Sequence, residues 1–235
     1  MIDTHSHILP GVDDGARDFD ESVEIVKSLV SQGVTDIIAT PHYVVESTFD
    51  SPRAKNIELL AQLRERLEKE NVPVNLYLGN EIFFNEEIPQ LVSGGLISPL
   101  VDSKYLLVEI SLSGESTGFS EYFLELMNLG YKVVFAHPER YLITQNNYEI
   151  LGNLYEMGVL FQCNMGSVVG KYGKAAKKLV RRLAKEKKIF MLGSDSHRPL
   201  RSDMIIEARK KLSRYYDKEE LEQVLIGNAR SIIEG

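Results

Sequence analysis

Histidine and acidic residues in this chain gather in a few short motifs, each at the point where a run of apolar residues ends. All five histidines belong to these motifs, and they are His5, His7, His42, His137 and His197. Imidazole and carboxylate groups are the ligands that borderline and hard divalent metal ions accept in proteins. The pattern therefore predicts a site that holds more than one metal ion.

Acidic residues accompany the histidines at the ends of the apolar runs. The acidic members of the set are Asp14, Glu81, Glu109 and Asp195. Taken singly, each motif is weak evidence, because a lone histidine is more often a hydrogen-bonded core residue and most glutamates are exposed on loops. The metal interpretation rests on the whole set, since no histidine is left elsewhere in the chain.

Short aliphatic runs alternate with segments of helical spacing, which is typical of repeated βα units. The expected strands are residues 1–5, 36–40, 74–79, 105–110, 132–136, 159–163 and 189–193. The expected helices are residues 18–33, 52–67, 119–129, 148–157, 174–187, 202–215, 218–227 and 228–233.

Repeated βα units produce parallel strands with right-handed crossovers, and a chain of this length most often closes them into a barrel. We therefore predict an α/β barrel of the TIM type, built as a single domain over residues 1–235. An open doubly wound sheet is the alternative, but no glycine-rich turn follows the first strand. In a barrel, functional residues collect at the carboxyl ends of the strands, so all the motifs should meet on one rim.

Composition excludes several classes of function. A net charge of -7 and a pI near 5.4 argue against a nucleic acid as the main partner. No apolar run approaches the roughly 20 residues that a membrane span requires. The first residues carry no secretory signal, and the single cysteine, Cys163, lies in an apolar run that predicts a buried side chain. We expect a cytoplasmic protein without membrane insertion.

Three strings of residues are specific. Residues 2–15 read Ile-Asp-Thr-His-Ser-His-Ile-Leu-Pro-Gly-Val-Asp-Asp-Gly, residues 40–43 read Thr-Pro-His-Tyr, and residues 137–141 read His-Pro-Glu-Arg-Tyr. With Gly-Asn-Glu at 79–81 and Asp-Ser-His at 195–197, the chain resembles the polymerase and histidinol phosphatase (PHP) superfamily over nearly its whole length. Within it, the chain is most similar to the bacterial capsule-type (CpsB-like) protein-tyrosine phosphatases.

The resemblance implies a distorted barrel of seven βα units, the PHP fold, with three divalent metal ions. The first ion would be held by His5, His7, Glu81 and Asp195, and the second by Glu81, Glu109 and His137. The third would be held by Asp14, His42 and His197, with the neighbouring Asp13 as the alternative to Asp14. No ligand position of the family is missing from this sequence.

The family's chemistry is the hydrolysis of a phosphate monoester by a metal-activated hydroxide. A bound metal ion lowers the pKa of water from about 16 to about 7, so no phosphoenzyme is needed. The resemblance favours manganese, although iron, cobalt and zinc accept the same ligands. Arg140 and Arg201 are the candidates for binding phosphate oxygens in a bidentate manner, and Arg198 competes with Arg201 for that role.

Three further features carry weaker predictions. Residues 171–188 hold nine lysines and arginines against one glutamate, which indicates either a solvated helix face or a docking face for an acidic, tyrosine-rich peptide tail. The loop of residues 43–50 could line the entrance to the site and stack Tyr43 or Phe49 on a phosphotyrosine ring. Asn164 could face the site or cap the following loop.

The resemblance implies a manganese-dependent protein-tyrosine phosphatase. Its partner would be the phosphotyrosine tail of a bacterial tyrosine kinase that regulates capsule or exopolysaccharide synthesis. A histidinol-phosphate-type small-molecule phosphatase is the first alternative, and a PHP nuclease and a non-catalytic metal-binding subunit follow. The acidic charge counts against the nuclease. The sequence does not decide the oligomeric state or the proton donor to the leaving group.

Overall fold

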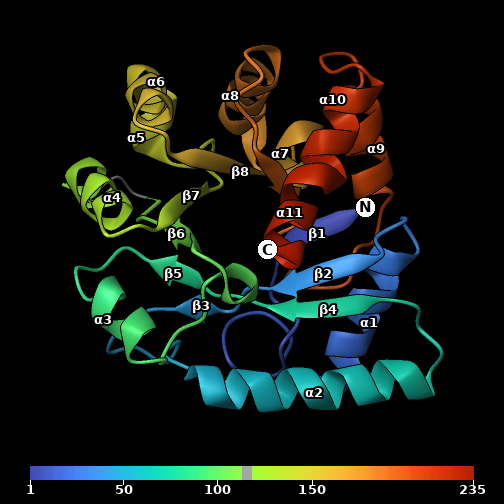
Figure 1. Ribbon diagram of the computed structural model, residues 1–235. Helices are drawn as coiled ribbons and strands as arrows, with labels where there is room; N and C mark the ends of the chain where they lie inside the picture. Colours follow the sequence, from blue (N-terminus) through green and yellow to red (C-terminus); the bar gives the residue numbers. More distant parts are fainter. Residues whose placement is uncertain (113–117) are drawn as a thin grey trace.

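Parallel strands curve into a barrel wall, and helices cover its outer side (Figure 1). The structure is a computed structural model and describes residues 1–112 and 118–235. The strands are β1 Ile2–Ser6, β2 Asp36–Ala39, β3 His42–Tyr43, β4 Asn75–Leu78, β5 Glu81–Phe83, β6 Tyr105–Glu109, β7 Lys132–Ala136, β8 Leu160–Asn164 and β9 Met191–Gly193. Each of the seven expected strands is present with small shifts at its ends. The predicted α/β barrel fold is confirmed.

The wall consists of two hydrogen-bonded parallel sheets. One has the order β1-β2-β4 and the other the order β3-β5-β6-β7-β8-β9. The two short strands β3 and β5 were not expected, and each continues the direction of the strand before it after a break of two residues. Pro41 separates β2 from β3, because proline has no N–H to donate to a neighbouring strand. The barrel is therefore distorted on this side.

Gly79 marks the second break. A Cβ at this position would lie 2.7 Å from Cδ2 of Leu100, so a larger residue would collide with the helical turn packed there. Two-residue breaks let His42 and Glu81 start new strands, and these two residues are direct partners in the register of β3 with β5. The distortion thus brings a histidine and a glutamate of the predicted site side by side.

The barrel closes between its first and last strands. The backbone N–H of Asp195 donates to the carbonyl of His5 at 2.8 Å, and the N–H of His7 donates to the carbonyl of Ser196 at 3.1 Å. Gly193 permits this approach, since a Cβ there would lie 2.4 Å from the Cβ of His5. Closure places the N-terminal histidine motif directly beside the C-terminal one, 190 positions away in the sequence.

The helices found in the described residues are α1 Phe19–Val30, α2 Arg53–Lys69, α3 Ile88–Ser93, α4 Phe119–Asn128, α5 Leu142–Asn146, α6 Glu149–Glu156, α7 Met165–Val169, α8 Gly173–Lys185, α9 Met204–Leu212, α10 Lys218–Glu222 and α11 Asn228–Glu234. The short helices α3, α5 and α7 were not expected. Asp18 caps α1 by accepting a hydrogen bond from the backbone N–H of Glu21. Residues 218–227 are not one α-helix, because α10 gives way to a π-helix at Gln223–Gly227.

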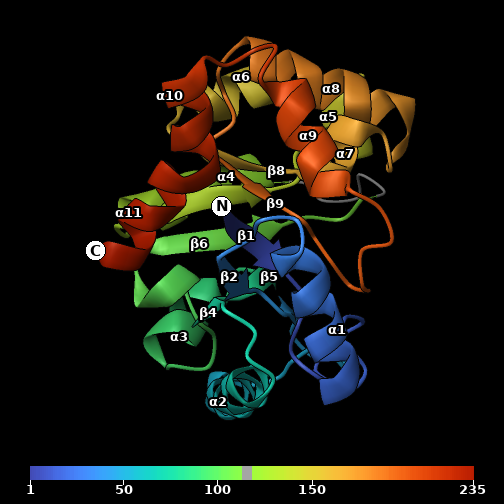
Figure 2. The same ribbon diagram turned by 90° about the vertical axis from the view of Figure 1, so that its right-hand side faces the viewer.

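The helices bury their apolar sides against the wall. Phe123 of α4 meets Phe135 of β7 edge to face, with ring centroids 5.3 Å apart. Cys163 on β8 is fully buried, as predicted, and burial raises the pKa of its thiol well above the usual value. Figure 2 shows α7, α8 and α9 together at one corner of the barrel.

Substitution of Gly193 by alanine tests the closure of the barrel. We expect the added methyl group to push β9 away from His5 and to lower the free energy of unfolding by about 1–3 kcal/mol. Urea unfolding followed by circular dichroism measures this. Gly152→Ala in α6 is the matched control, because nothing lies within 4 Å of its Cβ position, and it should be neutral or slightly stabilising. An unchanged unfolding midpoint for Gly193→Ala would show that the approach is not tight.

Candidate metal centre

The nine residues predicted as metal ligands meet on one rim of the barrel. They come from the carboxyl ends of β1, β6, β7 and β9, from the starts of β3 and β5, and from the loop after β1. Three groups of their ligand atoms each lie within 4.8 Å of one another, namely His5 with His7 and Glu81, His42 with Glu81 and Glu109, and His7 with Asp14, His42 and His197. Only residues in this one region of the described chain form such groups.

Glu81 lies at the centre of the site and is fully buried. Its Oε2 is 2.9 Å from Nε2 of His5, and 3.2 Å from both Nε2 of His7 and Nδ1 of His42. Its Oε1 is 2.7 Å from Nε2 of His137. One carboxylate therefore contacts four imidazoles, which is the arrangement of a bridging ligand.

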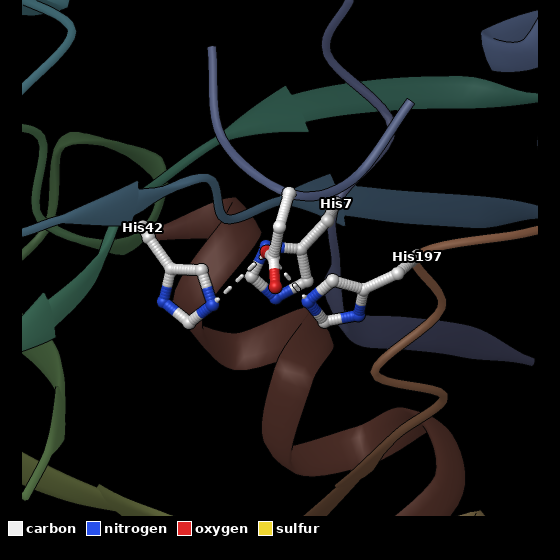
Figure 3. Close-up of side chains that lie close together, drawn as sticks. His7, His42 and His197 are labelled. Atoms are coloured by element: carbon white, nitrogen blue, oxygen red, sulfur yellow. Dashed lines mark ion pairs between the residues drawn. The ribbon is translucent and has the colours of Figure 1, made fainter. Parts of the chain in front are cut away.

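A second convergence lies at the outer side of the site. Figure 3 shows the imidazoles of His7, His42 and His197 turned toward one another. The rings of His7 and His197 stack with centroids 3.9 Å apart. Oδ1 of Asp14 is 3.1 Å from Nε2 of His197 and 3.6 Å from Nε2 of His42. The Asp14 side chain is 58% exposed, so this group opens to solvent.

Asp13 and Asp14 have different roles in the structure. The buried Asp13 places Oδ2 2.8 Å from Nδ1 of His7, and it also accepts the backbone N–H groups of Gly15 and His42. These contacts orient His7 and leave its Nε2 facing the centre of the site. A carboxylate behind a ligating histidine is the usual arrangement in metal sites. The geometry favours Asp14 as a ligand and Asp13 as the residue that positions His7.

Asp195 divides its two oxygens between the site and its support. Oδ1 lies 3.5 Å from Nε2 of His7 and 3.4 Å from Nδ1 of His197. Oδ2 accepts from Arg140 and from the side-chain amide of Asn164, both at 2.6 Å. Asn164 therefore faces the site, and its side chain makes no cap to the following helix.

Sequence reasoning missed Gln162. Its Oε1 lies 2.9 Å from Nδ1 of His5, and its Nε2 donates to Asn164. The available signal was a polar residue between two buried apolar ones on β8, because alternation sends Gln162 to the barrel interior. Gln162 supports His5 from behind, as Asp13 supports His7.

The donor set fits divalent metal ions. Donor atoms about 2.0–2.2 Å from one ion lie about 3.0–3.4 Å apart, close to many of the contacts around Glu81. Nδ1 of His42 and Nδ1 of His137 are buried without a hydrogen bond among the described residues. Nδ1 of His42 nevertheless lies 2.8 Å from Oε1 of Glu109. Ligand atoms that crowd together without hydrogen-bond geometry are expected around a cation.

The resemblance grouped Glu81 and Glu109 with His137. The structure instead brings His42 between these two glutamates, while His137 contacts the other oxygen of Glu81.

Two backbone positions of the site are in the left-handed region, His137 with φ 31° and Asp195 with φ 52°. Such positions cost energy in residues other than glycine and cluster at functional sites.

The buried carboxylates and imidazoles of the site shift the pKa values of one another. Burial alone would raise the pKa of Glu81, but His5 and the other imidazoles hold that pKa well below its usual range. Burial alone would lower the pKa of His7, yet Asp13 and Glu81 raise it well above its usual value. Burial likewise opposes the charged form of His42, and Glu81 with Glu109 raises its pKa to about 9. The carboxylates therefore attract either protons on the imidazoles or metal cations.

A cationic pocket of about 380 Å³ adjoins the Asp195 side of the site. Its basic lining comes from Arg140, Lys171, Arg198 and Arg201. Arg198 donates to the backbone carbonyls of Asp14 and Gly15, so it fastens the Asp14 loop. Arg201 makes no ion pair or hydrogen bond within residues 1–112 and 118–235. Of the two, Arg201 is the side chain free to meet a ligand.

A second, more apolar pocket of about 390 Å³ borders other members of the cluster, His42 and Glu109. Its apolar lining comes from Val44, Phe49, Phe83, Ile110 and Leu112. The Phe49 ring stacks on His42 with centroids 5.9 Å apart and an interplanar angle of 16°. Phe49 thus lines the entrance as predicted. The same prediction was wrong for Tyr43, because its side chain is buried in the hydrophobic core.

Residues 1–234 match the model of the family described as capsular polysaccharide synthesis, CpsB/CapC. The chain belongs to this family. The tyrosine-protein phosphatase YwqE of Bacillus subtilis is 37% identical to it over 84% of this chain and 77% of YwqE. The tyrosine-protein phosphatase CpsB of Streptococcus pneumoniae is 28% identical over 99% of this chain and 98% of CpsB.

Solved structures agree with this assignment. A structure from the crystallographic study of YwqE from Bacillus subtilis and CpsB from Streptococcus pneumoniae, described as unique metal-dependent tyrosine phosphatases, superimposes with a TM-score of 0.91. It is 33% identical, and the match covers 100% of this chain and 94% of the other. Histidinol phosphate phosphatase from Lactococcus lactis shares the fold alone, with a TM-score of 0.57 and 14% identity.

None of the helices in the described residues is both long and apolar enough to span a membrane.

Metal uptake should release protons. Because the pKa of His42 is raised to about 9, this imidazole holds a proton near neutral pH in the metal-free protein and must lose it to bind a cation. The apparent affinity should therefore rise with pH. Isothermal titration calorimetry with Mn²⁺ in two buffers of different ionisation enthalpy measures the release. A binding heat that is the same in both buffers would contradict this protonation state.

Proposed function

We propose that this protein is a metal-dependent protein-tyrosine phosphatase, a phosphoric monoester hydrolase acting on phosphotyrosine. The observation that carries the proposal is the position of the histidine cluster between a cationic pocket and an apolar, aromatic pocket. A phosphate ester of an aromatic alcohol needs both environments on opposite sides of the scissile bond. Membership of the CpsB/CapC family, with relatives named tyrosine-protein phosphatases, supports it.

The cationic pocket would receive the phosphate oxygens. Arg201 is free to bind them, and guanidinium groups match phosphate in a bidentate manner. Arg140 lines the same pocket while it holds Oδ2 of Asp195, and its guanidinium lies 4.3 Å from the ring centroid of Tyr172. The ion pair with Asp195 and this ring contact hold the Arg140 guanidinium in place. We assign Arg140 and Arg201 to phosphate binding and Arg198 to the support of the Asp14 loop.

The apolar pocket would receive the tyrosine ring. Phe49 and Phe83 present ring surface, and Ile110 and Leu112 complete the lining. Aromatic pairs add about 0.5–1.5 kcal/mol beyond the burial of area, so the pocket would favour an aryl ester over an alkyl one. The phenolate of tyrosine, with a pKa of about 10, leaves with little protonation, whereas an alkyl alcohol needs a general acid.

We further propose three divalent ions, with manganese as the physiological metal. When bound, such ions supply an activated water and neutralise the phosphate oxygens. The proposed ligands are His5, His7, Glu81 and Asp195 for one ion, Glu81, Glu109 and His137 for another, and Asp14, His42 and His197 for the third. Gln162, Asp13, Asn164 and Arg140 would keep these side chains oriented. Nδ1 of His42 lies 2.8 Å from Oε1 of Glu109, so the ligand sets proposed for two of the ions adjoin each other.

The substrate we propose is the phosphotyrosine tail of a bacterial tyrosine kinase that controls capsule or exopolysaccharide synthesis. The family's description as capsular polysaccharide synthesis supports this partner. A kinase that uses ATP acts in the cytoplasm, and we place the phosphatase there too. We also propose that residues 1–235 act as one PHP-type domain, since every strand of the wall contributes to one barrel.

Comparison of two substrates tests the proposed function. Manganese-loaded protein should hydrolyse a phosphotyrosine peptide far faster than histidinol phosphate, and His5→Ala should abolish both activities. A preference for histidinol phosphate would instead assign the chain to small-molecule metabolism. Cleavage of neither monoester, together with cleavage of a phosphodiester such as DNA, would favour a nuclease.

A variant of the apolar pocket tests whether the tyrosine ring of the substrate binds there. Phe49→Ala should lower kcat/KM for the phosphotyrosine peptide by roughly tenfold, because the stacking surface on one side of the ring is lost. Activity on an alkyl phosphate should change little. Leu129→Ala, an exposed apolar residue far from the site, serves as the matched control. Equal losses on aryl and alkyl phosphates would mean that Phe49 supports His42 rather than the substrate.

A further inference from the structure

Six of the nine basic residues of the segment 171–188 share one surface of the molecule. Helix α8 presents Lys174, Lys177, Lys178, Arg181, Arg182 and Lys185 around a shallow depression of about 550 Å³. We call these six residues the α8 basic face. It stands out because the whole chain carries a net charge of -7. Ordinary solvation of a helix requires no such concentration of one sign of charge.

Most of this charge is not neutralised from within the protein. Arg182 pairs with Glu186 one turn later, and Arg181 donates to the hydroxyl of Tyr215. The side chains of Lys174, Lys178 and Lys185 make no ion pair or hydrogen bond with any residue in the described part of the chain. Three exposed lysines on one helix side repel one another, and an external anion would relieve this repulsion.

A groove with an apolar floor runs beside the α8 basic face, between α8 and α9. Val180, Leu212 and Tyr215 contribute apolar surface to it. Its rim carries four basic side chains, Lys177 and Arg181 from α8 and Lys211 and Arg214 from α9 and the turn after it. Lys211 is paired with Glu207, the one acidic partner that α9 offers along this groove. A basic rim over an apolar floor suits an acidic chain with occasional apolar side chains.

The two helices that form the groove both begin at the candidate active site. Tyr172 precedes α8, and Met204 begins α9, and both line the cationic pocket together with Arg140 and His197. Lys177 of α8 lies near Glu207 of α9. One turn further along α8, Arg181 donates a hydrogen bond to the hydroxyl of Tyr215, which follows α9. The two helices therefore run in the same direction away from that pocket. Figure 2 shows α8 and α9 at the same corner of the barrel, where α7 packs against both. The basic surface therefore leads directly away from the phosphate-binding arginines.

We propose that the α8 basic face and the α8–α9 groove bind the acidic polypeptide segment that flanks the phosphotyrosine of the substrate. This inference rests on the proposed function and specifies its substrate class. Helix α8 has 13 residues and is about 20 Å long, which matches about six residues of an extended peptide. The apolar floor and the acidic total charge disfavour a nucleic acid or an anionic membrane as the occupant.

Matched peptides and charge variants test this proposal. Two phosphotyrosine peptides of equal length carry either glutamate or glutamine at the flanking positions. The variant Lys174→Gln/Lys178→Gln/Lys185→Gln removes the three unpaired charges of the α8 basic face. The control Lys55→Gln/Lys69→Gln/Lys104→Gln removes three exposed lysines elsewhere. All kinetics are measured on manganese-loaded protein at low and high ionic strength.

We expect wild-type protein and the control to prefer the glutamate peptide by roughly tenfold in kcat/KM at low ionic strength, mainly through KM. High ionic strength and the α8 variant should each remove the preference. Hydrolysis of p-nitrophenyl phosphate should be the same in all three proteins, which shows that the site is intact. An unchanged preference in the α8 variant would overturn the proposal.

A binding measurement separates failure of this inference from failure of the proposed function. Fluorescence anisotropy follows a labelled, unphosphorylated glutamate-rich peptide with each protein, so no turnover is needed. Weaker binding to the α8 variant than to the control would support the docking surface even if no phosphotyrosine were hydrolysed. Equal binding to both would overturn it. The proposal would also be overturned if the α8 variant bound single-stranded DNA or phosphatidylserine vesicles more weakly than the control did, while both bound the peptide equally.

Discussion

The contact of one buried carboxylate, Glu81, with four imidazoles is the interaction on which this site depends. Five histidines on one rim would repel one another once protonated, and a buried glutamate alone would be costly to ionise. Together they hold the pKa of Glu81 well below its usual range and raise those of His5, His7 and His42. A divalent cation can take the place of the protons without moving the ligands far.

The distortion of the barrel serves this contact. The break after β4 lets Glu81 begin β5, and the break after β2 lets His42 begin β3 as its direct neighbour. The close approach at Gly193 then brings Asp195 and His197 against His5 and His7. The irregularities are thus part of the site rather than imperfections of the fold.

Much of this arrangement was predictable because the decisive signals are local. Periodicity identified the seven main strands, and placing the motifs at strand ends predicted that the nine polar residues would meet on one rim. The short strands β3 and β5 were not predictable, since two or three residues carry no periodicity. Gln162 was missed for a related reason, because its contact with His5 joins residues 157 positions apart. Tyr43 was misjudged because tertiary contacts decide which way its side chain turns, and the sequence left the choice between Arg198 and Arg201 open for the same reason.

Electron paramagnetic resonance of the manganese-loaded protein tests the central role of Glu81 most directly. If Glu81 bridges ions held by the surrounding imidazoles, we expect an exchange-coupled manganese spectrum in the wild-type protein and loss of the coupling in Glu81→Gln. The same protein sample can be checked for metal content before the measurement. A spectrum of isolated, uncoupled Mn²⁺ in fully loaded wild-type protein would contradict a shared centre built around this carboxylate.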